Sequence, residues 1–198
     1  MNLEGCFVAL SVEAAARPAL TTWLDLLVEW NQRIDLTAAR TDDELTDLML
    51  ADAALLAKHL SPSARVIDIG SGAGAPGLAL ALMRPDLDVT LVEPIAKRTS
   101  FLRTVVGTVR RPDVTILRDR GEAVADRSPL GFDVAISRAT LAPAEWIPLS
   151  LRLAKTGWAL VAREAPPDIP GAKIDADLSY TWPATGAQRR ALRYVRAV

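Results

Sequence analysis

The residues with the clearest chemical potential are an aspartate followed by alternating glycines. The stretch VIDIGSGAGAPGLALA, residues 66–81, places Asp68 just before Gly70, Gly72 and Gly74. Glycines in this arrangement allow a sharp turn and a close approach of the backbone to a ligand, because any Cβ there would strain φ or fill the space. The stretch therefore predicts a ligand site rather than a simple connection.

Two cofactor classes fit this pattern. GSGAGA satisfies the dinucleotide motif G-x-G-x-x-G/A, but a pyrophosphate is anionic and prefers helix N–H groups to the nearby carboxylate of Asp68. S-adenosylmethionine carries a sulfonium and an ammonium, which an acid can face. Glu93 follows about 20 residues later, where a carboxylate can accept both ribose hydroxyls of either cofactor. The combination favours S-adenosylmethionine, with a nicotinamide dinucleotide as the alternative.

The segments around these residues predict the elements that must position them. From residue 65, short β-rich runs alternate with helical ones, which indicates a doubly wound α/β fold with a mostly parallel sheet of seven strands. Ligands bind beyond the carboxyl ends of such strands, where the glycines fall. The last two strands have no helix between them and are expected to pair antiparallel at one edge. The expected strands are RVIDI, VTLVE, VTILR, FDVAIS, WALVAR, DLSYTW and RALRYVRAV.

The first 60 residues are predicted to be helical. Apolar residues recur at helical spacing in LTTWLDLLVEWNQRI, residues 20–34, and Thr41 with Glu44 forms a capping-box pattern that opens a second helix. Two parts are therefore expected: an N-terminal helical extension over 1–62, and a methyltransferase core that binds S-adenosylmethionine over 63–198.

Composition limits the remaining possibilities. The chain has 198 residues with one cysteine, Cys6, and one histidine, His59, so neither an internal disulfide nor a zinc cluster is expected. No apolar run reaches the roughly 20 residues of a membrane span. The sequence thus predicts a cytoplasmic monomer without a metal or a membrane partner.

The charge is distributed unevenly along the chain. Residues 1–64 hold 10 acids and 4 bases, whereas the rest holds 14 acids and 19 bases. A nucleic acid, if bound, is therefore expected on the second part. The arginines of the segment 189–196 have two interpretations that stay open: contacts to RNA, or the solvated face of an edge strand.

Several motifs in matching order resemble one family. LLVEWNQRIDLTA, VIDIGSGAGAPGLALA, EPIAKRTSFLR, DRGEAV and FDVAISRA are similar to the corresponding segments of the RsmG (GidB) family. These bacterial methyltransferases act on N7 of a guanine in small-subunit ribosomal RNA. The resemblance covers about residues 20–163, and the EWN and SRA motifs are more specific than the glycine turn.

The resemblance implies a role for individual residues. The methionine part of the cofactor would be held by Gly70, Gly72, Gly74 and Ala75, its ribose by Glu93, and its adenine by Gly121 and Glu122. Arg138 of SRA would be catalytic, beside the point where the methyl group is delivered. Arg98, Arg138 and Arg163 would bind the substrate, which is small-subunit ribosomal RNA, alone or in the assembled subunit.

Some positions depart from the family pattern. The His-x-x-Asp-Ser-Leu signature has Met49 for the histidine and Ala53 for the serine, and Asp35 replaces a second asparagine near the N-terminus. Arg163 replaces a lysine, and no helical pattern follows in the segment 163–177. A different function therefore stays open: a divergent relative that methylates a small molecule, or that binds the cofactor without turnover.

Overall fold

The computed structural model describes residues 2–138, 140–162 and 167–197. Seven strands form one sheet in the order β3-β2-β1-β4-β5-β7-β6. The first five strands are parallel, and β7 runs antiparallel to both β5 and β6. The strands are β1 (Arg65–Ile69), β2 (Asp88–Val92), β3 (Thr115–Leu117), β4 (Phe132–Arg138), β5 (Ala154–Val161), β6 (Ala172–Thr181) and β7 (Gln188–Arg196). The predicted fold class is confirmed.

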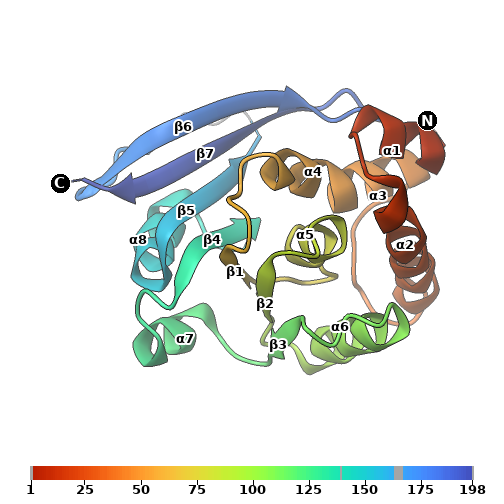
Figure 1. Ribbon diagram of the computed structural model, residues 1–198, viewed down its shortest axis with the longest axis horizontal. Helices are drawn as coiled ribbons and strands as arrows, with labels where there is room; N and C mark the ends of the chain where they lie inside the picture. The colour runs from red at the N-terminus through yellow and green to blue at the C-terminus, as the bar shows by residue number, and fades with distance from the viewer. Residues whose placement is uncertain (1, 139, 163–166, 198) are drawn as a thin grey trace.

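Helices cover both faces of the sheet (Figure 1). One face packs against α7 (Gly121–Arg127) and α8 (Pro143–Leu153). The other face packs against α5 (Gly77–Met83) and α6 (Ala96–Thr108), together with the N-terminal helices. The N-terminal elements are α1 (Leu3–Ala9), η1 (Ala14–Ala16), α2 (Arg17–Asn31), α3 (Asp42–Thr46), η2 (Asp47–Ala51) and α4 (Asp52–Ala57).

The N-terminal helices share a hydrophobic core with the sheet. Leu20, Trp23 and Leu27 of α2 are fully buried, and they belong to the same apolar cluster as Val66 of β1 and Leu78 of α5. The amphipathic stripe predicted for this helix is therefore the surface that packs on the core. This packing is continuous across residues 62 and 63, where the extension and the core are expected to divide. The division into two domains stays a prediction.

The second predicted helix contains a π-helical turn that the sequence pattern did not indicate. Thr41 is its N-cap and accepts a hydrogen bond from the backbone N–H of Glu44 at 3.2 Å, as the capping-box pattern predicts. The helix then runs through α3, the π-helical η2 and α4 without a break. Because π-helical bonds join residues five apart, Asp47 and Asp52 are one turn apart, and both side chains are buried.

The last two strands correct one expectation about the C-terminal arginines. β7 lies between β5 and β6, so β6 is the edge strand and β7 is not. Arg190 of β7 pairs with Asp177 at 2.5 Å, and Arg193 pairs with Asp175 at 2.7 Å, both across to β6. Interstrand ion pairs of this kind, rather than protection of an edge, account for these two arginines.

Within the described residues, no helix combines the length and the apolar character that crossing a membrane requires.

Candidate functional site

A cavity of about 650 Å³ lies at the carboxyl ends of β1, β2 and β4. This is the edge at which ligands bind in open α/β sheets. The N-terminal segment supplies one wall and the glycine turn another. The lining residues are Leu36, Thr37, Ala38, Leu48, Met49, Gly70, Ser71, Gly72, Ala73, Ala75, Glu93, Pro94, Ile95, Arg98, Arg138 and Thr140. The structure thus brings six of the predicted site residues around one cavity: Gly70, Gly72, Ala75, Glu93, Arg98 and Arg138.

The three glycines of the turn have different local reasons for being glycine. All three have positive φ, with values of +73° for Gly70, +56° for Gly72 and +109° for Gly74. A Cβ on Gly70 would lie 2.3 Å from the Thr140 hydroxyl, and one on Gly74 would lie 2.9 Å from the Leu78 side chain. At Gly72 the nearest heavy atom is the Gly70 carbonyl oxygen at 3.8 Å. Gly72 therefore faces open space in the cavity, whereas packing constrains the other two.

Trp23 of α2 supports the turn from the N-terminal side. Its indole N–H donates to the carbonyl oxygen of Ala73 at 2.9 Å, and its side chain is fully buried. A buried carbonyl without a partner would cost free energy, so this bond fixes the turn to the helix. A tryptophan on an apolar helix stripe is predicted to be core, and the sequence carries no signal for this second role.

Asn31 shapes the part of the cavity wall that the N-terminal segment supplies. Its side-chain oxygen accepts hydrogen bonds from the backbone N–H groups of Leu36 at 2.8 Å and of Thr37 at 3.0 Å. These bonds fold the chain back after α2, which brings residues 36–38 to the cavity. The asparagine of the EWN motif therefore positions the wall, while Asp35, the departure from the family pattern, is exposed.

Glu93 follows β2 and is 2% exposed. One carboxylate oxygen accepts the N–H of Gly72 at 2.9 Å, and the other accepts the N–H of Ile95 at 2.8 Å. Each oxygen of an ionised carboxylate can accept a second hydrogen bond. The geometry therefore fixes the carboxylate beside the turn and leaves acceptor capacity for the two hydroxyls of a ribose.

Asp68 lies beneath the turn and does not line the cavity. It is fully buried, and one carboxylate oxygen accepts the N–H of Gly77 at 3.0 Å, at the start of α5. The other oxygen has no hydrogen-bond partner among the described residues. Burial raises the pKa of Asp68 to about 7, against the opposing effect of the Gly77 hydrogen bond. Asp68 thus links the end of β1 to the start of α5 beneath the turn. Its second carboxylate oxygen accepts no hydrogen bond from the described residues.

The raised pKa of Asp68 predicts a pH-dependent stability. Because the folded state binds this proton more tightly than the unfolded state, the stabilising contribution is complete below about pH 4 and is lost as the pH rises through about 7. The free energy of unfolding that this proton contributes below about pH 4, relative to that above about pH 7, is on the order of 4 kcal/mol. Asp68→Asn should remove this part of the pH dependence.

Urea unfolding of the wild type and of Asp68→Asn at several pH values from 4 to 8 measures the effect. The difference in unfolding free energy between the two proteins should shift in favour of the variant as the pH rises. A constant difference across this range would show that Asp68 titrates normally in the folded protein.

The predicted adenine-binding residues lie outside the cavity lining. Gly121 begins α7 and is buried, and a Cβ there would lie 2.8 Å from the Ile69 side chain. Glu122 is exposed. Packing of α7 against β1 therefore explains the glycine at 121, and the adenine contact of both residues stays a prediction.

Two guanidinium groups line the cavity. Arg138 ends β4, and its Nη1 donates to the carbonyl oxygen of Leu48 and lies 3.5 Å from Asp52. Arg98 lies on α6, and its buried Nε has no hydrogen-bond partner among the described residues. Both guanidinium groups therefore lie at the carboxyl edge of the sheet. Arg163, the third predicted substrate-binding residue, lies outside the described residues.

Two departures from the family signature fall on the helix beside the cavity. Met49 is 3% exposed and lines the cavity, and Ala53 is fully buried. Both residues are apolar and packed, so this part of the wall offers no hydrogen bond from these side chains.

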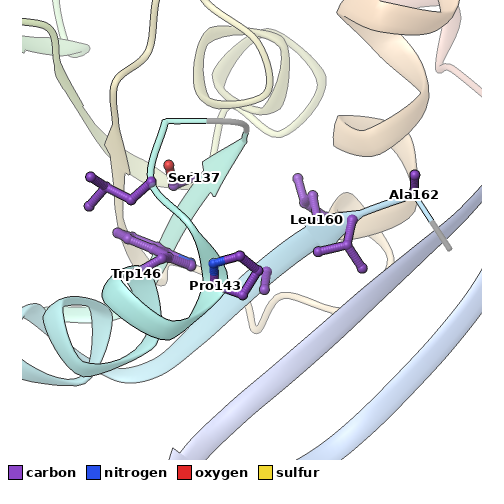
Figure 2. Close-up of a pocket in the computed structure, with 8 residues that line it drawn as sticks. Ser137, Pro143, Trp146, Leu160 and Ala162 are labelled. Atoms are coloured by element: carbon purple, nitrogen blue, oxygen red, sulfur yellow. The ribbon is translucent and has the colours of Figure 1, made fainter. Parts of the chain in front are cut away.

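A second cavity of about 260 Å³ lies between β4, β5 and the start of α8 (Figure 2). Its two polar side chains donate to backbone carbonyl oxygens: the Ser137 hydroxyl to that of Ile69 at 2.8 Å, and the Trp146 indole to that of Trp158 at 2.8 Å. These two donors are therefore already used within the protein.

Comparison with known proteins identifies the family. The model of the family described as rRNA small subunit methyltransferase G matches residues 16–165. A ribosomal RNA small subunit methyltransferase G from Chromobacterium violaceum is 38% identical over 146 residues, which cover 74% of this chain and 69% of that protein. The relative from Methylobacillus flagellatus is 33% identical over 187 residues, covering 92% and 90%. The chain belongs to the rRNA small subunit methyltransferase G family. The predicted resemblance is confirmed.

Solved structures give the same fold. MtNAS in complex with MTA and tNA matches with a TM-score of 0.62 at 12% identity, covering all of this chain and 83% of that one. TrmN from Thermus thermophilus matches with a TM-score of 0.57 at 18% identity, covering 77% and 48%. At these identities the likeness concerns the fold alone.

Proposed function

We propose that this protein transfers a methyl group from S-adenosylmethionine to N7 of a guanine in small-subunit ribosomal RNA. The observation that carries the proposal is the shared cavity, which is lined by Gly72 and Glu93 as well as by Arg138. S-adenosylmethionine supplies an electrophilic methyl group on its sulfonium. The family supplies the substrate class, since the relatives are named as ribosomal RNA small subunit methyltransferases.

The residues of the cavity fit this cofactor. The open space at Gly72 allows a ligand to approach the backbone, and Glu93 keeps acceptor capacity for a ribose. Asp68 lies beneath the turn rather than in the cavity lining, and its charge, when it is ionised, would favour a cationic ligand nearby. The roles of these three residues are part of the proposal.

The ionisable residues that line the cavity fit N7 as the target atom. They are Glu93, whose two oxygens each accept a backbone N–H, and two arginines, which stay protonated in proteins. Guanine N7 carries a lone pair and no proton, so its methylation requires no general base. Orientation of the base and exclusion of water are sufficient contributions from the protein.

Arg138 and Arg98 are the proposed contacts to the RNA. A guanidinium can donate two parallel hydrogen bonds to the O6 edge of guanine or to a phosphate. Arg190 and Arg193 are held by aspartates of β6, so we expect a smaller contribution from them. We infer that the chain acts in the cytoplasm, where small subunits are assembled, and as a monomer.

The test is methylation of purified small subunits that lack this modification, with labelled S-adenosylmethionine. The expected product is one 7-methylguanosine per subunit, identified by mass spectrometry after digestion of the RNA. Small subunits that are already modified serve as the control and should take up no label. Binding of the cofactor without incorporation into RNA would contradict the proposal and would favour a divergent relative with a small-molecule substrate.

A further inference from the structure

One buried carboxylate connects the predicted catalytic arginine to the C-terminal hairpin. Asp52 is 3% exposed. Its Oδ1 accepts the hydroxyl of Tyr180 at 2.7 Å and the indole N–H of Trp182 at 2.9 Å. Its Oδ2 lies 3.5 Å from Nη1 of Arg138. Three donors from two distant parts of the chain therefore meet on one side chain.

Two groups of one continuous helix contact the guanidinium of Arg138. Its Nη1 contacts the carbonyl oxygen of Leu48 as well as Asp52, and its side chain is 17% exposed. Among the described residues, the other guanidinium nitrogens of Arg138 make no hydrogen bond. The helix therefore fixes one end of the guanidinium and leaves its remaining donors for a ligand.

The π-helical turn η2 places this helix against the hairpin at two points. Asp47 accepts the N–H of Ala184 at 3.1 Å, and the N–H and hydroxyl of Thr185, each at 2.7 Å. Asp52 contacts Tyr180 and Trp182 one turn later. Figure 1 shows the far end of the β6–β7 hairpin beside these N-terminal helices. Asp47 anchors the hairpin without contacting Arg138, whereas Asp52 contacts both.

We propose that Asp52 is a positioning residue for Arg138, and that Tyr180 and Trp182 of the C-terminal hairpin hold Asp52 in the orientation that methyl transfer requires. This inference rests on the proposed function, because it concerns the same site. It adds three residues that act through Arg138 rather than on the substrate. A charged hydrogen-bond network of this kind has a defined geometry, since each oxygen of Asp52 has its own donors.

The decisive measurement is a double-mutant cycle between Asp52→Asn and Arg138→Ala. If Asp52 acts through Arg138, Asp52→Asn should lower kcat by about thirtyfold in the wild type, because misplacement of a positioned group by 1 Å can cost about a hundredfold. In the Arg138→Ala background the same substitution should lower kcat by less than about twofold. An equal fold decrease in kcat in both backgrounds would overturn the proposal, because it would indicate that Asp52 acts independently of Arg138.

Asp47→Asn is the matched control. It removes the charge of a buried acid on the same helix that also contacts the hairpin, but it leaves the contact with Arg138 in place. Its effect on kcat, whatever its size, should be the same in the wild type and in Arg138→Ala. Thermal unfolding of each variant establishes that it is folded under the assay conditions.

Tyr180→Phe keeps the proposal testable if Asp52→Asn fails to fold. It removes one hydroxyl donor and retains the ring. We expect kcat to fall by about fivefold, with an unchanged Kd for S-adenosylmethionine and, again, almost no effect in the Arg138→Ala background. A fivefold loss that persists in that background would count against a role through Arg138.

A readout without substrate separates this inference from the proposed function. In protein with ¹⁵N-labelled arginine, the side-chain resonance of Arg138, assigned by its loss in Arg138→Lys, should move in Asp52→Asn and in Tyr180→Phe but not in Asp47→Asn. If the resonance moves but the wild-type protein does not methylate small subunits, the contact between Asp52 and Arg138 is supported and the proposed substrate is wrong. If the resonance is unchanged, the network is wrong whatever the substrate.

Discussion

Arg138→Ala is expected to lower kcat for methylation of small subunits by at least about a hundredfold, while the Kd for S-adenosylmethionine changes by less than about threefold. The backbone of Arg138 is fixed by the pairing of β4 with β5, in which Arg138 lies opposite Leu160. A side chain with so rigid an origin can orient a base, and orientation is the contribution that this chemistry needs. Single-turnover kinetics and calorimetry measure the two quantities.

Arg138→Lys tests whether charge alone is sufficient. A lysine ammonium is a point charge and cannot reproduce a planar contact with two donors, so we expect it to recover little activity. Arg193→Ala is the matched control, because Arg193 is paired with Asp175 on the hairpin and lies outside the cavity lining. It should retain turnover. Unchanged turnover in Arg138→Ala would show that Arg138 serves only to join β4 to the helix.

Gly72→Val is expected to abolish binding of S-adenosylmethionine in calorimetry at any accessible concentration. The valine side chain would project into the open part of the cavity, since no protein atom lies within 3.8 Å of the Cβ position. The positive φ of +56° adds strain of about 1–2 kcal/mol. The Gly72 N–H that orients Glu93 would also be displaced.

Gly171→Val separates the loss of the cavity from backbone strain. Gly171 has a φ of +77° and no heavy atom within 4 Å of its Cβ position, and it does not line the cavity. The two variants should therefore unfold at similar temperatures, but only Gly72→Val should lose the cofactor. Normal cofactor binding by Gly72→Val would place the ligand elsewhere.

The parallel part of the sheet was predictable because its strands are buried on both faces. Strands such as 65–69 and 132–138 consist of near-continuous apolar residues, and this pattern has few alternative interpretations. The start of β5 was not predictable: the strand begins at Ala154, directly after α8, in a segment with charged and small residues. The length of β5 is set by its pairing with β4 and β7, and the local sequence pattern does not predict that pairing.

The candidate site was predictable where a backbone constraint selects the residue type. The glycines of the turn and the acid after β2 are of this kind, because positive φ and a fixed carboxylate each demand particular residues. The supporting contacts were not predictable. Trp23 and Asn31 contact the site from α2, and Asp52 contacts Tyr180 across 128 positions of sequence. Such contacts depend on tertiary packing, which one sequence does not record.

The strand order has a consequence for how the molecule assembles during synthesis. β6 is made before β7, yet it joins the sheet through β7, which lies between it and β5. Until β7 emerges, the open edge of β5 exposes unpaired backbone groups, and such edges favour aggregation. The hairpin residues that donate to Asp47 and Asp52, such as Thr185 and Tyr180, are synthesised more than 120 residues later. A chain still being translated can therefore form its glycine turn before the contacts of Asp52 with Tyr180 and Trp182 exist. If these contacts position Arg138 as we propose, methyl transfer begins only after the hairpin has formed.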